Sequence, residues 1–175
     1  MAHAQVSPAE MLKRVARFRD LKPNPEAFVD SLLPGHLREN IRILGKGVSD
    51  DPSHRPAISE PHGFNVGVVK ATPGNGAGLH SHLTVEVFFV LSGQWTLYWG
   101  DRGENEIPLG PWDTISFPPG VMRGFRNSGK ENGHLMTILG GSDPGRVTWP
   151  SDILEQALET TGAYLDEDGD LIRPS

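Results

Sequence analysis

Residues 74–93 read GNGAGLHSHLTVEVFFVLSG, and this stretch holds the densest chemistry of the chain. His80 and His82 lie two residues apart, and Glu86 follows four residues later. Because side chains alternate between the two faces of an extended strand, all three point the same way if the strand is regular. They offer two neutral nitrogen ligands and one anionic oxygen ligand, the set of non-haem Fe(II) oxygenases, which also suits Zn and Ni. The stretch therefore predicts a divalent metal site.

The spacing of these residues also resembles a known family. Gly74, the His80-x-His82 pair, Glu86 and Gly93 are separated by five, three and six residues. This arrangement resembles the complete first motif of the cupin superfamily. The resemblance implies a jelly-roll β-barrel whose first motif supplies metal ligands, here His80, His82 and Glu86.

A second cupin motif is expected further along, in the form G-x5-P-x-G-x2-H-x3-N. Pro118, Gly120 and Asn127 stand in its places. Two positions depart from it, because Trp112 occupies the leading glycine and Arg123 stands where the last metal-binding histidine belongs. The family fold is therefore expected, whereas the usual metal site is altered.

Arg123 decides what kind of site this is, because a guanidinium cannot lose its proton and so cannot bind a metal. In one interpretation it lies beside the metal, where the local charge of about +2 favours a carboxylate or an enolate. In a second, it forms an ion pair with Glu86 and no metal binds. In a third, it points to solvent. His62 and His134 are weaker candidates for a replacement ligand, since a lone histidine is more often a hydrogen-bonded or surface residue.

Aromatic residues beside the motifs are candidates for the wall of a ligand pocket. Phe88 has the same strand parity as Glu86, and Phe125 has the same parity as Arg123. Both are therefore predicted to bind substrate, with plain core packing as the alternative.

Composition limits the class of protein. The 175 residues are enough for one domain with a real core, and the 21 glycines and 15 prolines suit short strands joined by turns. The net charge of −6 argues against a nucleic-acid partner. There is no cysteine, so disulfides and thiol chemistry are excluded. No apolar run reaches the roughly 18 residues of a membrane span or resembles a signal peptide, so we expect no membrane partner and a cytoplasmic location.

The chain is predicted to be mainly β, with helical additions at both ends. Residues 1–40 form a helical arm, 41–142 the cupin β-barrel, and 143–175 a C-terminal helix and hairpin of the same domain. The elements expected within them are helices at 8–20, 25–33 and 151–161, a hairpin at 168–169, and strands at 41–44, 64–71, 79–91, 94–99, 113–117, 122–127 and 134–139.

The resemblance implies a metal-dependent enzyme acting on a small anionic or oxygenated compound. Dioxygenase-like chemistry is favoured, with lyase or isomerase activity as further options, and the cofactor is a divalent ion such as Fe, Mn, Ni or Zn. Arg123 would orient or stabilise the anionic group, which suggests a carboxylate ligand. The alternative is a metal-free cupin that binds or senses a small ligand, with Arg123 paired to Glu86. A homodimer is expected, because exposed strand edges are readily satisfied by a partner.

Overall fold

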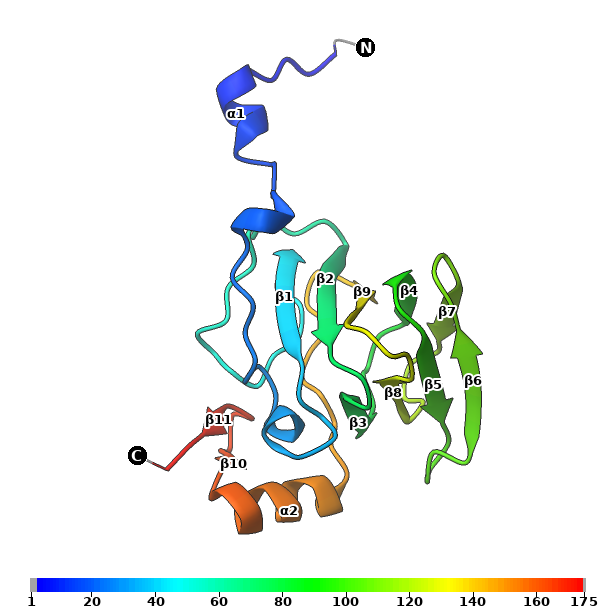
Figure 1. Ribbon diagram of the computed structural model, residues 1–175. Coiled ribbons are helices and arrows are strands. Elements are labelled where there is room, and N and C mark those ends of the chain that lie inside the picture. Colours follow the sequence, from blue (N-terminus) through cyan, green and yellow to red (C-terminus); the bar gives the residue numbers. More distant parts are fainter. Residues whose placement is uncertain (1–2, 175) are drawn as a thin grey trace.

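The computed structural model describes residues 3–174, and antiparallel strands form most of the regular structure (Figure 1). A five-stranded sheet contains, in spatial order, β1 (Glu39–Leu44), β2 (Phe64–Ala71), β9 (Gly133–Gly140), β4 (Glu86–Ser92) and β7 (Thr114–Phe117). A four-stranded sheet contains β3 (Gly76–His80), β8 (Arg123–Asn127), β5 (Trp95–Trp99) and β6 (Asn105–Leu109). The predicted mainly β, cupin-like jelly-roll architecture is confirmed.

The main hydrophobic core lies between the two sheets, because both contribute to it. Trp95 and Leu97 of β5 meet Phe88 and Val90 of β4, and all four are fully buried. On β4 the buried positions alternate with partly exposed ones, as expected for a strand with one face on a core. The indole nitrogen of Trp95 donates to the Ser92 carbonyl at 3.0 Å, so burying the ring leaves no unpaired polar atom there.

The strand predicted at 79–91 is wrong as a single element. The chain leaves the four-stranded sheet at His80 and enters the five-stranded sheet at Glu86. Between them, Ser81 forms an isolated bridge with Thr148, and the His82 carbonyl accepts a hydrogen bond from Gly120 at 2.8 Å. The metal-ligand candidates are therefore gathered by a crossing between sheets and not by the alternation of one strand.

One strand was not predicted. β6 spans Asn105–Leu109 and contains Pro108. Proline removes a backbone donor, so it is tolerated in strands mainly at sheet edges. β6 is the last strand of its sheet, which explains why this sequence forms a strand although its composition predicts none.

The N-terminal arm is less helical than predicted. The capping box of Ser7 and Glu10 is present, but α1 ends after five residues (Pro8–Leu12), and a short 3-10 helix, η1, follows at Phe18–Asp20. No residue of α1 is buried, and Figure 1 shows the arm extending away from the sheets. Helices shorter than about 12–15 residues are marginal without packing, which accounts for the early end.

The second part of the arm and the C-terminal segment pack together beside the barrel. The 3-10 helix η2 (Val29–Leu32) contacts α2 (Ser151–Thr161), which has the predicted bounds and ends at Gly162 in the left-handed conformation. The hairpin of β10 (Tyr164–Leu165) and β11 (Leu171–Ile172) follows. These elements enclose a second core. None of the helices in the described residues has the length and apolar character that crossing a membrane requires.

Candidate metal centre

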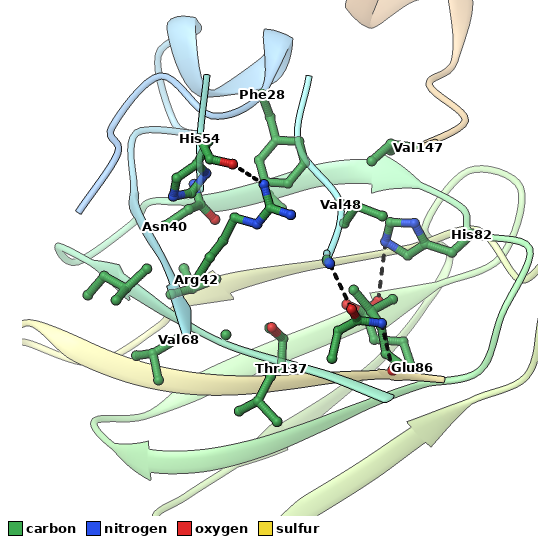
Figure 2. Close-up of a pocket in the computed structure, with 18 of the residues that line it drawn as sticks. Phe28, Asn40, Arg42, Val48, His54, Val68, His82, Glu86, Thr137 and Val147 are labelled. Carbon is green, nitrogen blue, oxygen red and sulfur yellow. Dashed lines mark hydrogen bonds and ion pairs between the residues drawn. The ribbon is translucent and has the colours of Figure 1, made fainter. Parts of the chain in front are cut away.

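The structure brings His80, His82 and Glu86 together. One ligand atom from each lies within 4.8 Å of the other two, and the residues are 6%, 2% and 3% exposed. His80 is the last residue of β3, and Glu86 is the first residue of β4. The group therefore lies where the chain crosses from one sheet to the other, and in Figure 2 His82 and Glu86 face each other across the cavity wall.

Hydrogen bonds set the orientation of His80. Its Nδ1 lies 2.8 Å from the Gly78 carbonyl, so Nδ1 carries the proton and Nε2 carries the free lone pair. The Gly78 amide in turn donates to Asp30 at 2.9 Å, and Asp30 forms a buried ion pair with Arg38 at 2.7 Å. This chain of contacts reaches from the arm to the first candidate ligand. Partners of this kind orient metal-binding histidines in proteins.

Both histidines are neutral at physiological pH. Burial lowers the pKa of His80 well below its usual range, and the nearby His82 and Arg123 lower it further. Burial, followed by the charge of Arg123, lowers the pKa of His82 to about 3. Neutral imidazole is the form that binds a metal ion. The Nδ1 of His82 is buried without a protein partner, and its Nε2 faces Glu86.

Arg123 lies inside the protein and pairs with Glu86. Its Nε and Nη2 both donate to Glu86 Oε2, at 3.0 and 2.6 Å, while Nη1 donates to the Val121 carbonyl at 3.0 Å. The arginine is 0% exposed, so it does not point to solvent. Burial raises the pKa of Glu86, and the Arg123 guanidinium opposes that rise. The ion pair considered in the sequence analysis is therefore present.

The donor set also fits a divalent ion. Two ligand atoms each about 2.1 Å from an ion at a tetrahedral angle lie about 3.4 Å apart. The Nε2 of His82 and Oε2 of Glu86 are 3.6 Å apart, close to that separation. Two nitrogens and one carboxylate suit Fe, Mn, Ni or Zn. The geometry thus permits a metal ion at Glu86. Binding it is opposed by repulsion, because the ion would be a second cation beside Arg123.

The two phenylalanines predicted to bind substrate lie differently. Phe125 lines the cavity that contains the candidate ligands, so its binding role stays a prediction. Phe88 is 0% exposed and packs its ring against Phe117 and Phe125, with centroids 6.0 and 5.3 Å apart. It does not line the cavity and is a core residue, because the cavity reaches Glu86 at the start of β4 but not Phe88 two residues further along the same face.

The replacement histidines considered from the sequence do not reach the candidate metal centre. His134 lies 3.0 Å from the Ser92 hydroxyl and contacts the Phe18 ring. His62 lies 2.6 Å from the Glu60 carbonyl. Neither lines the cavity. Within residues 3–174, the triad of His80, His82 and Glu86 is the one group of at least three such side chains placed to hold a metal ion.

The cavity has a second polar wall that sequence reasoning missed. Its volume is about 70 Å³, and besides the triad it is lined by Asn40, Arg42 and His54. Asn40 and Arg42 are two residues apart on β1 and so share a face, but in a strand that also contains Glu39 this pattern gave no distinct signal. His54 lies in a loop with no such pattern. Apolar residues from both sheets line most of the remainder.

Comparisons with known proteins agree with the fold. A family model described as "Cupin domain" matches residues 67–139. A cupin 2 domain-containing protein from Halorhodospira halophila superposes with a TM-score of 0.53 at 22% identity, over 70% of this chain and 77% of that chain. An RmlC-like cupin from Shewanella frigidimarina gives a TM-score of 0.51 at 13% identity, over 74% and 89%. No curated protein matches the sequence. Residues 67–139 therefore match a cupin domain, and at these identities the structural likeness concerns the fold alone.

Proposed function

We propose that the protein is a metal-dependent enzyme acting on a small anionic or oxygenated organic compound. The observation that carries the proposal is the convergence of His80, His82 and Glu86 on one cavity wall, with their ligand atoms within 4.8 Å. Glu86 already pairs with Arg123, but the two buried imidazoles have one protein hydrogen bond between them, from His80 to the Gly78 carbonyl. A divalent cation would give them a further partner. The cupin fold supports the proposal, because the triad lies in the family's first motif.

A divalent ion held by the triad would supply Lewis-acid or redox chemistry, dioxygenase-like by family resemblance, with lyase or isomerase chemistry as further options. The protein's own contribution is to hold two neutral imidazoles at fixed positions and to exclude bulk water. Arg123 adds a fixed positive charge next to Glu86. Arg123 does not line the cavity, so this charge would act at a distance, beyond Glu86, on negative charge that develops on a substrate oxygen.

The cavity limits the size of the substrate. A buried water needs about 10–15 Å³ of such volume, so a cavity of about 70 Å³ has room for roughly five waters. A compound of a few heavy atoms therefore fits without movement of the walls.

We further propose that the enzyme is cytoplasmic, because a chain with no cysteine gains nothing from an oxidising compartment.

A second candidate is favoured by the ion pair itself. Two neutral imidazoles, the Glu86 carboxylate and the Arg123 guanidinium sum to zero charge, so the site is balanced without a cation. A divalent ion would raise the sum to about +2. In this alternative the protein is a metal-free cupin that binds or senses a small ligand in the same cavity.

Metal content separates the two candidates. Protein purified without a histidine tag is expected to contain a substantial fraction of an equivalent of Fe, Mn, Ni or Zn, and loading with the right ion should raise its melting temperature. The double variant His80→Ala/His82→Ala should lose the ion. His62→Ala, outside the cavity, is the matched control and should keep it. Full occupancy in the double variant would reject the metal-dependent enzyme, and so would a parent protein that binds none of the four ions.

A further inference from the structure

A cluster of three polar side chains lies apart from the metal-ligand candidates in the same cavity. Asn40 and Arg42 project from β1, and His54 comes from the loop that follows it. In Figure 2 the three lie together beneath Phe28, away from Glu86. Arg42 donates a hydrogen bond to the backbone carbonyl of His54, which ties the loop to the strand.

The cluster concentrates unpaired polar atoms. In the described part of the chain, five buried side-chain nitrogen or oxygen atoms have no protein partner, and three of them are Asn40 Nδ2, Arg42 Nε and His54 Nε2. Asn40 and His54 are each 7% exposed. A buried polar atom that nothing pairs with destabilises the folded state. Three of them on one cavity wall indicate a binding site.

Arg42 is the exception among the arginines that line the interior. Arg38 pairs with Asp30 at 2.7 Å, and Arg123 pairs with Glu86 at 2.6 Å. Among residues 3–174, no carboxylate lies within salt-bridge distance of Arg42. Burial, followed by the charge of Arg55, lowers the pKa of Arg42 to about 10, so the guanidinium is still charged at neutral pH. A bound anion would supply the partner that the fold withholds.

His54 adds an acceptor to this wall. Its Nδ1 lies 3.5 Å from the hydroxyl oxygen of Ser49, whose own proton is donated to the Ala27 carbonyl at 2.9 Å. The proton between His54 and Ser49 therefore belongs to Nδ1, and Nε2 presents a lone pair to the cavity. Burial and the charge of Arg42 lower the pKa of His54 to about 4, which keeps the ring neutral.

We propose that Asn40, Arg42 and His54 form a binding site for a small hydroxy acid. The carboxylate accepts from the Arg42 Nε and the Asn40 amide, and the hydroxyl donates to the His54 Nε2. One guanidinium matches a singly charged carboxylate better than a doubly charged phosphate. The site deepens the function proposed above by naming the ligand class of the same cavity, and it rests on that function only for the reaction at the triad.

Calorimetry on protein dialysed against a chelator tests the site without the metal. Racemic lactate, which has six heavy atoms, is the probe; propionate lacks its hydroxyl and lactamide lacks its charge. Lactate should bind, propionate should bind about tenfold or more weakly, and lactamide should not bind measurably. Arg42→Gln should weaken lactate binding by at least about tenfold. Arg102→Gln removes an exposed arginine outside the cavity and should leave lactate binding unchanged.

Asn40→Asp keeps the test decisive if Arg42→Gln does not fold. The new carboxylate lies two residues from Arg42 on the same strand face, so it should raise the melting temperature and abolish lactate binding. Lactate binding that survives Asn40→Asp, equal binding of lactate and propionate, or tighter binding of inorganic phosphate would overturn the proposal. Binding of lactate by a protein that takes up no metal would reject the metal-dependent enzyme and keep this site. Binding of metal by a protein that takes up no lactate would reject this site and keep the metal-dependent enzyme.

Discussion

The Nη2 atom of Arg123 lies 2.6 Å from Oε2 of Glu86, and its Nε donates to the same oxygen at 3.0 Å. Both side chains are buried, and the arginine occupies the position at which the second cupin motif would place a metal-binding histidine. The register explains the contact, because β3 and β8 pair His80 with Arg123. One substitution thus puts a fixed cation where the family has a ligand.

Replacing Arg123 with histidine should destabilise the metal-free protein and strengthen metal binding. Removing one partner of a buried ion pair leaves an uncompensated charge, which costs about 3–5 kcal/mol. The new imidazole adds a donor and removes a repelling charge, so affinity for a divalent ion should rise. Chemical denaturation in chelator measures the first effect, and titration with metal measures the second.

Arg126→His is the matched control for that substitution. Arg126 lies on the same strand, but its pair with Glu106 is exposed, with side chains 45% and 59% accessible. Exposed pairs contribute about 0–1 kcal/mol, so the control should unfold close to the parent. If Arg123→His and Arg126→His behave alike in both assays, the buried pair has neither of the roles assigned to it.

Glycine at position 112 should give a more stable protein than alanine at the same position. Among the described residues it is the one non-glycine with a positive φ, 76°, at the position where the family motif has glycine. A side chain in this conformation costs about 1–2 kcal/mol. Trp112 is 76% exposed and contacts the ring of Phe89, so truncation loses little buried surface. Trp112→Ala loses the same contact but keeps the strained Cβ. Trp112→Gly is therefore expected to be about 1 kcal/mol more stable than Trp112→Ala in urea unfolding, and equal stabilities would contradict the strain.

Asp50 should make stability fall as pH rises. Burial raises its pKa to about 7, although its carboxylate accepts from the Val29 amide and the Trp149 indole. Between about pH 4 and 7 the folded state holds a proton that the unfolded state has released, so the stabilisation is complete below pH 4 and is lost toward pH 7. The loss is on the order of 4 kcal/mol.

Asp50→Asn isolates this contribution, because the amide oxygen still accepts hydrogen bonds and does not titrate. The buried histidines act with the opposite sign, since the lowered pKa of His54 means that its stabilisation is lost on acidification below about pH 6.5. The informative quantity is therefore the unfolding free energy of the parent minus that of the variant. We expect this difference to decrease from pH 4 to 7, and a flat difference would show that Asp50 ionises normally.

The sequence predicted the triad because its signal is local. Ligand types at the spacing of His80, His82 and Glu86 were enough, even though the single strand assumed for them was wrong. The segment 81–85 contains neither glycine nor proline, so its crossing between sheets gave no turn signal. The contact of Arg123 with Glu86 depended on the pairing of β3 with β8, which is tertiary information.

The second polar wall was beyond sequence reasoning for a related reason. Asn40 and Arg42 share a strand face, but a polar pair on a strand more often faces solvent. The burial of Asn40 and the carbonyl contact of Arg42 require the loop that carries His54 to fold over β1. Only the folded chain shows that these polar groups line the same cavity as the triad.

The N-terminal arm is expected to join two copies of the chain. Met11 and Leu12 of α1 are 50% and 63% exposed, and Val15 and Phe18 after it are 47% and 48% exposed. Figure 1 shows the arm standing away from the sheets, so these side chains have no core of their own. Exchange of identical arms about a two-fold axis would bury them at little cost. Sedimentation should show a homodimer at micromolar concentration.

The double variant Met11→Glu/Val15→Glu tests the arm directly, because it places two charges on the apolar surface that the partner would cover. It should sediment as a monomer with an unchanged circular dichroism spectrum, since neither residue contributes to the two cores. Lys13→Glu changes charge on the same exposed segment without removing apolar surface, so this variant should stay dimeric. A parent protein that is monomeric at high micromolar concentration would refute the dimer. If the double variant is still dimeric, the arm is not the interface, and a sheet edge such as β6 or β7 becomes the candidate.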